Sequence, residues 1–156
     1  MRLCRLRIML PGAAAMCIAL AAHSPALAAP RDQVRCLALA LYWEARTEGE
    51  AGMRAVGSVV LNRVAHPDFP DSVCAVIEQG GEHPPCQFSW WCDGRSNRPT
   101  EAGAWARALA LARQMLTKPP EDRTGGALFF HNATIRSPWS GQRQRTVRIG
   151  RHIFYR

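Results

Sequence analysis

Helical spacing of apolar side chains in two adjacent stretches, residues 31–48 and 50–65, constrains the fold most. Apolar residues recur there every three or four positions, so each stretch would present an apolar face as an α-helix. These are Val34, Leu37, Ala38, Leu41 and Ala45 in the first stretch, and Met53, Val56, Val60, Leu61 and Val64 in the second. We expect Gly49 to end the first helix and His66-Pro67 to end the second, because a residue before proline disfavours helical geometry.

A loop-rich segment follows these two helices. A short helix is predicted over residues 72–79. Residues 80–99 hold six glycines and prolines, so we expect loops there, with a short strand at 87–91. Thr100 is expected to cap a further helix that ends near Thr117.

The final third of the chain has strand-like patterns at residues 127–131, 146–149 and 152–155. Gly150 and Arg151 separate the last two segments and predict a tight hairpin turn. Helices first and a small antiparallel sheet toward the C-terminus make the predicted fold class α+β.

The first 28 residues have the features of a signal peptide. Three arginines precede an apolar stretch, and Ala26-Leu27-Ala28 supplies the small-x-small pattern of a cleavage site. The apolar stretch is short and contains Pro11, which argues against a permanent membrane helix. We therefore expect residues 29–156 to form one exported domain that is not stably inserted in a membrane.

The charge of the chain indicates the kind of surface it can bind. The formal net charge is +8, and it falls to +5 without residues 1–28, which contain three arginines and no acidic residue. A basic exported protein can hold to anionic cell-wall polymers. Nucleic acid would suit the charge but not the compartment, so we expect no nucleic-acid partner. The expected location is the periplasm or cell wall, or the medium, and the expected state is a monomer.

Four cysteines remain in the expected domain: Cys36, Cys74, Cys86 and Cys92. An even number in an exported chain favours disulfides, and three connectivities can be drawn. One bridge with two buried thiols is the alternative.

Glu44 is the strongest candidate for a catalytic residue. It lies beside Tyr42 and Trp43 on an otherwise apolar helix. An apolar setting raises the pKa of a carboxyl, so the group can hold a proton near neutral pH and donate it to a leaving oxygen. The alternative is an exposed glutamate on the helix surface.

Two further carboxyls are candidate helpers. Glu48 lies one helical turn after Glu44 and would share its face. It could equally be solvated at the helix end, or pair with Arg54. Asp93 follows a cysteine and precedes Gly94, where it could contact substrate or brace a turn.

Residues 87–91 suggest a carbohydrate-binding surface. Sugars have apolar faces and polar rims, so Trp90 and Trp91 could stack on them while Gln87 and Ser89 bind hydroxyl groups. We expect Phe88 to belong to the core and at least one tryptophan to face a groove.

His131 and Asn132 end a predicted strand, where polar side chains can line a cleft. His152 and Tyr155, on the last predicted strand, have the same two interpretations, structural or substrate-binding. The candidate ligands for a zinc ion are His83, Cys86, Cys92, His131 and His152. Their spacings match no usual zinc motif, and export favours oxidised cysteines, so we expect neither a metal nor a cofactor.

Six ordered motifs together resemble the SleB/CwlJ-like cell-wall hydrolases, a family known for spore-cortex-lytic enzymes. The motifs are Tyr42-Trp43-Glu44-Ala45-Arg46-x-Glu48-Gly49, Val59-Val60-Leu61-Asn62-Arg63-Val64, Phe69-Pro70-x-x-Val73-Cys74, Gln87-Phe88-Ser89, Phe130-His131-Asn132 and Ile149-Gly150-x-His152-x-Phe154-Tyr155. The resemblance covers about residues 34–156. It implies a lysozyme-like catalytic domain over residues 29–156 in which Glu44 is the catalytic acid.

The resemblance also implies a substrate. It predicts cleavage of peptidoglycan glycan strands between N-acetylmuramic acid and N-acetylglucosamine. Gln87, Ser89, His131 and Asn132 map onto motifs expected to line the cleft. A single strong carboxyl favours a lytic transglycosylase over a hydrolase, which usually needs a second carboxylate. The alternatives are a non-catalytic wall-binding protein and a zinc amidase that cuts the peptide stem.

Overall fold

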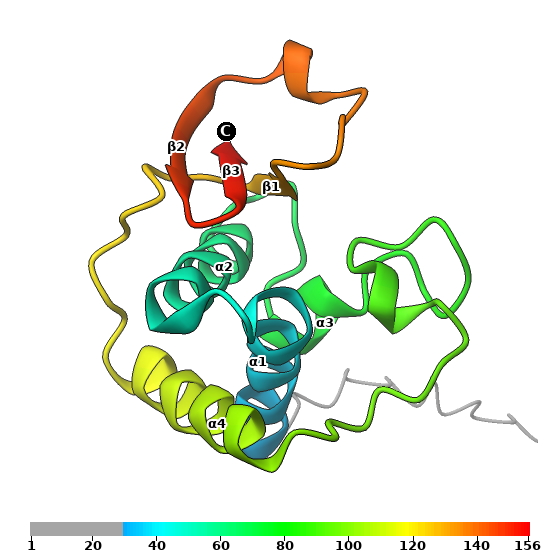
Figure 1. Ribbon diagram of the computed structural model, residues 1–156, viewed down its shortest axis with the longest axis vertical. Helices are drawn as coiled ribbons and strands as arrows, with labels where there is room; N and C mark the ends of the chain where they lie inside the picture. The colour runs from blue at the N-terminus through cyan, green and yellow to red at the C-terminus, as the bar shows by residue number, and fades with distance from the viewer. Residues whose placement is uncertain (1–29) are drawn as a thin grey trace, which may run out of the picture.

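The computed structural model describes residues 30–156, and the predicted signal peptide, residues 1–28, lies outside this part of the chain (Figure 1). The helices are α1 (Pro30–Ala45), α2 (Gly49–Val64), α3 (Val73–Ile77) and α4 (Ala102–Thr117), with two short 3-10 helices, η1 (Ser89–Trp91) and η2 (Ser140–Gln142). The strands are β1 (Phe129–Asn132), β2 (Arg145–Ile149) and β3 (His152–Tyr155). None of the helices within residues 30–156 is long and apolar enough to span a membrane.

Helix α1 lies at the centre of the helical part. The side chains at residues 37–42 are all buried, although they point in every direction around the helix. This is possible because α2, α3 and α4 all pack against α1 (Figure 1). Glu44 lies in the last turn of α1, so a helix that is packed on several sides holds this residue in place.

Helix α2 has two apolar faces. Met53, Val56 and Val60 join the core around α1. Ala55 and Val59 form a second cluster with Phe154 of the sheet. The sheet therefore covers the side of α2 that faces away from α1 (Figure 1).

The sheet is antiparallel with strand order β1-β3-β2. The predicted hairpin between β2 and β3 is confirmed, and Gly150 takes a φ of +57°, which favours glycine. The α+β class, with helices first and the small sheet last, is confirmed as well.

The predicted end of the first helix was wrong. α1 ends at Ala45, not at residue 48, and Gly49 is the first residue of α2 rather than a terminator. Gly49 has a φ of +68°, so it turns the chain sharply between the two helices. Glu48 lies at the N-cap of α2, but its side chain makes no capping hydrogen bond.

The strand predicted at residues 87–91 was also wrong, because part of this run forms η1. The disulfide between Cys86 and Cys92 holds their Cα atoms 6.4 Å apart. Six extended steps would span about 20 Å, so the run between these cysteines must fold back. Thr100 does not cap α4. The N-cap is Glu101, and the backbone N–H groups of Thr100 and Glu101 each donate to the Tyr42 hydroxyl at 3.1 Å.

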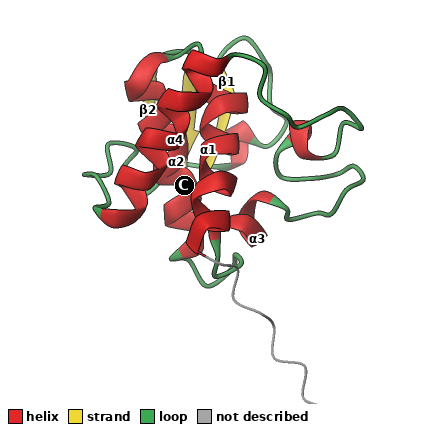
Figure 2. Cartoon of the chain, turned by 90° about the horizontal axis from the view of Figure 1, so that it is seen from below, coloured by secondary structure: helices red, strands yellow, loops and turns green. Residues whose placement is uncertain are grey.

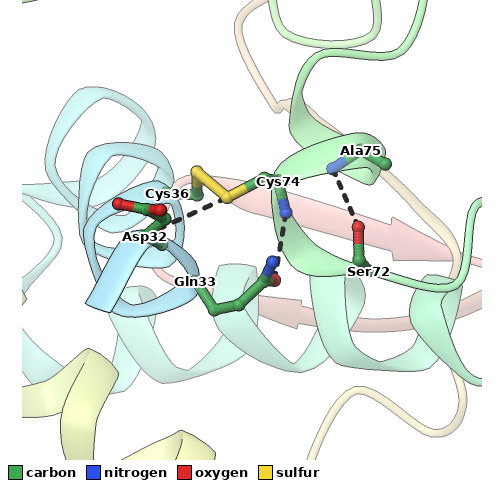
Figure 3. Close-up of a disulfide and its surroundings, with 6 residues drawn as sticks. All are labelled: Asp32, Gln33, Cys36, Ser72, Cys74 and Ala75. Atoms are coloured by element: carbon green, nitrogen blue, oxygen red, sulfur yellow. Dashed lines mark hydrogen bonds between the residues drawn. A yellow bond between two sulfur atoms is a disulfide. The ribbon is translucent and has the colours of Figure 1, made fainter. Parts of the chain in front are cut away.

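The four cysteines form two disulfides, Cys36–Cys74 and Cys86–Cys92. The first joins α1 to α3 across 38 residues of sequence. Gln33 supports this junction, because its side-chain oxygen accepts the N–H of Cys74 at 3.3 Å (Figure 3). The second closes a short loop within the segment between α3 and α4, which extends to one side of the helices (Figure 2).

Candidate active site

A cavity of about 560 Å³ lies at the junction of the helices, the loop before η1 and the sheet. Helices α1 and α2 each contribute one side chain from their last turn, and the rest come from the loop, β1, β3 and the segment between β1 and β2. The lining residues are Glu44, Arg63, Cys86, Gln87, Phe88, Ser89, Phe129, Phe130, His131, Asn132, Ile135, Trp139, Arg143 and His152. Glu44 is the one carboxyl among these described residues.

Glu44 has the ionisation behaviour that a proton donor needs near neutral pH. Burial disfavours its charged form and raises the pKa of the carboxyl from 4.5 to about 7. Two smaller effects lower the pKa: the Trp90 indole N–H and the positive charge of Arg63. Because burial outweighs both, the carboxyl is about half protonated near pH 7.

Trp90 and Trp91, both predicted to bind sugar, do not line the cavity. Trp90 is buried and stacks on Trp43 with ring centroids 6.5 Å apart. Within residues 30–156 its Nε1 has no acceptor at hydrogen-bond geometry, so this N–H is left to interact with the Glu44 carboxyl. Trp91 is half-buried and lines a separate groove with residues of α1 and α3. Phe88, expected in the core, is buried.

Gln87 and Ser89 are exposed and line the cavity from the loop that precedes and enters η1. The Cys86–Cys92 disulfide closes the loop that contains both residues, and Cys86 itself lines the cavity. Both polar side chains are thus presented to the cavity by a covalently closed loop.

The sheet supplies an ordered polar pair, His131 and Tyr155. The His131 Nε2 atom lies 2.9 Å from the Tyr155 hydroxyl, and its Nδ1 atom lies 2.9 Å from the Asn132 carbonyl oxygen. The His131 and Tyr155 rings also stack, with centroids 5.4 Å apart. Tyr155 does not line the cavity, so it orients His131 from behind. The Asn132 side-chain oxygen accepts from the N–H and the hydroxyl of Thr134, which holds the end of β1.

The two candidate helpers, Glu48 and Asp93, do not line the cavity. The Glu48 carboxylate accepts from the backbone N–H of Arg151 at 2.9 Å and pairs with the Arg151 guanidinium at 2.5 Å. These hydrogen bonds lower the pKa of Glu48 and fasten the β2–β3 turn to the junction of α1 and α2. The predicted alternative of a pair between Glu48 and Arg54 does not form, because Arg54 pairs with Glu50.

Asp93 has a local role in its own turn. Its side chain accepts a hydrogen bond from the backbone N–H of Arg95 at 2.8 Å.

No role was predicted for Arg63 from the sequence, although its side chain lines the cavity. Its side chain is buried, and Nε donates to the Leu128 carbonyl oxygen at 2.7 Å. The guanidinium lies over the rings of Phe69, Phe88 and Phe129, at 5.3 to 5.7 Å from their centroids. The sequence did offer one signal for the burial of Arg63, because this arginine lies within the apolar run of the second predicted helix.

Arg143 was missed as well. Its guanidinium carbon lies 3.4 Å from the Phe129 ring centroid and 5.7 Å from that of Trp139. Burial and the charge of Arg143 both lower the pKa of Arg63, to about 10, while Glu44 opposes them. The sequence carries no local signal for Arg143, because a long excursion between two strands brings it to the cavity.

Metal binding finds no support in the arrangement. Two of the five zinc-ligand candidates, Cys86 and Cys92, are joined in a disulfide. Residues 30–156 contain no group of three histidine, cysteine or acidic side chains placed to hold an ion. His152 is buried at the cavity, and burial lowers its pKa, which favours the neutral ring.

The arrangement defines a class of protein: a lysozyme-like domain in which one half-buried carboxyl, that of Glu44, faces a cavity between helices and a small sheet. Solved structures agree. The chain superposes on the catalytic domain of the germination-specific lytic transglycosylase SleB from Bacillus anthracis with a TM-score of 0.63 and 32% identity, over 85% of this chain and 100% of that one. The catalytic domain of the Bacillus cereus SleB protein gives a TM-score of 0.60 and 31% identity, over 81% and 91%.

The sequence comparisons show the family. The profile of the family described as Cell Wall Hydrolase matches residues 47–155. The chain is 38% identical over 138 residues to the spore cortex-lytic enzyme of Bacillus subtilis (strain 168), covering 87% of this chain and 41% of that protein. It is 37% identical over 125 residues to the spore cortex-lytic enzyme of Halalkalibacterium halodurans, covering 79% and 34%.

The chain therefore belongs to the cell wall hydrolase family, as the six motifs indicated. It spans less than half the length of these two relatives.

Proposed function

We propose that this domain cleaves the glycan strand of peptidoglycan between N-acetylmuramic acid and N-acetylglucosamine, as a lytic transglycosylase. One observation carries the proposal: the single carboxyl that lines the cavity, Glu44, has a pKa of about 7. Relatives that are cortex-lytic enzymes or lytic transglycosylases, at 32 to 38% identity, support it. Action at the cell wall in turn requires export, in agreement with the signal-like residues 1–28.

The reaction needs only one group that gives and then takes a proton. Protonated Glu44 donates to the glycosidic oxygen, which leaves C1 of the muramic acid with the bonding electron pair. The C6 hydroxyl of the same sugar attacks C1, and its proton passes to the Glu44 carboxylate. The products are a 1,6-anhydro sugar and a free hydroxyl on the glucosamine, no water is consumed, and Glu44 is protonated again.

The lining of the cavity favours this route over hydrolysis. An inverting hydrolase needs a second carboxylate to activate water, and a retaining one needs it as a nucleophile. Glu48 is tied to Arg151 and Asp93 to its own turn, so neither is placed to act on a sugar in the cavity. Gln87, Ser89, His131 and Asn132 remain as the polar groups that bind the sugar rim.

Mass spectrometry of the products tests the proposal. Purified peptidoglycan is incubated with residues 29–156, with Glu44→Gln, and with Glu82→Gln as a matched control at an exposed loop glutamate. We expect 1,6-anhydro products from the wild type and from Glu82→Gln, and none from Glu44→Gln.

Other outcomes would point elsewhere. Reducing-end products would mean a hydrolase and would call for Glu48→Gln and Asp93→Asn. Cleaved peptide stems would mean an amidase. Binding to the wall without products from any variant would mean a wall-binding protein. Activity of Glu44→Gln equal to that of the wild type would remove Glu44 as the acid.

A further inference from the structure

The cavity carries more positive charge than the proposed chemistry uses. Arg63 and Arg143 both line it, and both guanidinium groups approach the Phe129 ring. Their mutual repulsion contributes to the lowered pKa of Arg63. When Glu44 is protonated, no other carboxylate among the described lining residues balances these two cations.

Arg63 has an unfilled donor in this cavity. The residue is 4% exposed, and Nη1 has no hydrogen-bond partner within residues 30–156. No salt bridge joins Arg63 to Glu44 in the described part of the chain. A buried donor without an acceptor costs free energy, and an oxygen atom of a bound ligand would remove that cost.

Arg143 is the second arginine that lines the cavity. Its side chain is exposed, it forms no salt bridge with any residue of 30–156, and the Phe129 and Trp139 rings support its guanidinium plane. A guanidinium that stacks on a ring keeps its edge N–H groups free, and their fork matches the two oxygens of a carboxylate.

Peptidoglycan offers such a carboxylate on only one of its two sugars. N-acetylglucosamine carries no acid, whereas muramic acid carries a lactyl group. Its carboxyl is either free or joined as an amide to a peptide stem that bears carboxylates of its own. We propose that Arg143, together with Arg63, forms a subsite for the carboxylate carried by the muramyl substituent and thereby selects which sugar lies next to Glu44. The inference rests on the proposed function, because it takes the glycan strand as the substrate.

A binding measurement tests this subsite independently of catalysis. The Glu44→Gln protein is titrated by calorimetry with three soluble tetrasaccharides of alternating glucosamine and muramic acid. One has free lactyl carboxylates, one has them as neutral methylamides, and one has them joined to L-alanyl-D-glutamate. The titrations are repeated in Glu44→Gln with Arg143→Gln, and with Arg145→Gln as a matched control at an exposed arginine that does not line the cavity.

We expect at least one carboxylate-bearing ligand to bind about tenfold more tightly than the neutral methylamide, as for one charge-assisted hydrogen-bonded contact. The ligand that shows the preference identifies the carboxylate as lactyl or as stem-borne. Arg143→Gln should abolish the preference, and Arg145→Gln should retain it.

Equal binding of all three ligands, or a preference that survives Arg143→Gln, would overturn the subsite. The absence of binding by any ligand would overturn the subsite together with the proposed glycan substrate, whereas equal binding would overturn the subsite alone. Because the Glu44→Gln protein is used throughout, these outcomes do not depend on whether the wild type cleaves peptidoglycan.

Discussion

Glu44 should reduce the stability of the folded protein above pH 7, and its replacement by glutamine should remove that cost. A pKa of about 7 in the folded state, against 4.5 for the free side chain, corresponds to about 3 kcal/mol at about 1.4 kcal/mol per pKa unit. Because the pKa is raised by folding, the folded state binds the proton more tightly than the unfolded state does. The stability associated with this proton is complete below pH 4.5, falls as pH rises, and is fully lost above the folded pKa of about 7.

Urea unfolding with the disulfides intact measures this effect. Wild-type and Glu44→Gln proteins are compared at several values between about pH 4 and about pH 8. The free energy of unfolding of Glu44→Gln minus that of the wild type should rise by about 3 kcal/mol across this range. Glu82→Gln, at an exposed loop glutamate, controls for the loss of one carboxyl and should follow the wild type.

Two parallel pH profiles would refute the reasoning, because they would mean that folding does not raise the pKa of Glu44. A difference that grows toward low pH would have the wrong sign and would refute it as well. The expected result would instead show that the cavity keeps the carboxyl protonated at the expense of stability, which is typical of active sites with a displaced pKa.

The remaining predictions concern the frame around the cavity and the absence of a metal. Glu48→Gln should lower the free energy of unfolding by about 1 kcal/mol at pH 7, because the hydrogen bonds from Arg151 hold the pKa of Glu48 below its usual value. This loss should shrink as pH falls below the usual glutamate pKa and vanish below the lowered pKa of the folded state, which urea unfolding at neutral and acidic pH checks. Replacing Cys36 and Cys74 by serine should lower the free energy of unfolding by about 4 kcal/mol, because this disulfide closes a loop of 38 residues. Replacing Cys86 and Cys92 should lower it by about 2 kcal/mol, because that loop spans only 6 residues. The second replacement should nevertheless reduce the cleavage of peptidoglycan more than the first, because its loop presents Gln87 and Ser89 to the cavity. EDTA should leave the rate of peptidoglycan cleavage unchanged. A loss of cleavage in EDTA would favour a zinc amidase.

The overall fold was largely predictable because local rules decided it. The apolar spacing over residues 31–65 dictates two helices wherever they pack, and Gly150 with Arg151 dictates a hairpin. The errors arose where a distant contact overrode the local pattern. The Tyr42 hydroxyl accepts hydrogen bonds from the backbone N–H groups just before α4, so Thr100 is not needed as a cap. The Cys86–Cys92 disulfide brings the ends of residues 87–91 too close together for an extended strand.

Parts of the cavity were predictable for a different reason. Glu44, Gln87, Ser89, His131 and Asn132 occur in motifs shared with a family, and all five line the cavity. Arg143 belongs to no such motif, and its position depends on the path of the chain between β1 and β2. For Tyr155 the sequence left a structural and a substrate-binding role open, and the structure places it behind His131, outside the lining.

The sequence by itself determined the helices, the hairpin, the even set of cysteines and the apolar neighbours that mark Glu44, because these depend on spacing along the chain. Only the tertiary structure decided how the cysteines pair, which carboxyl faces the cavity, and which is locked to Arg151. It also brought Arg63 and Arg143 to the same ring of Phe129. Burial and charge at a site are sums over neighbours that are distant in sequence, so the pKa of Glu44 is a property of the folded chain.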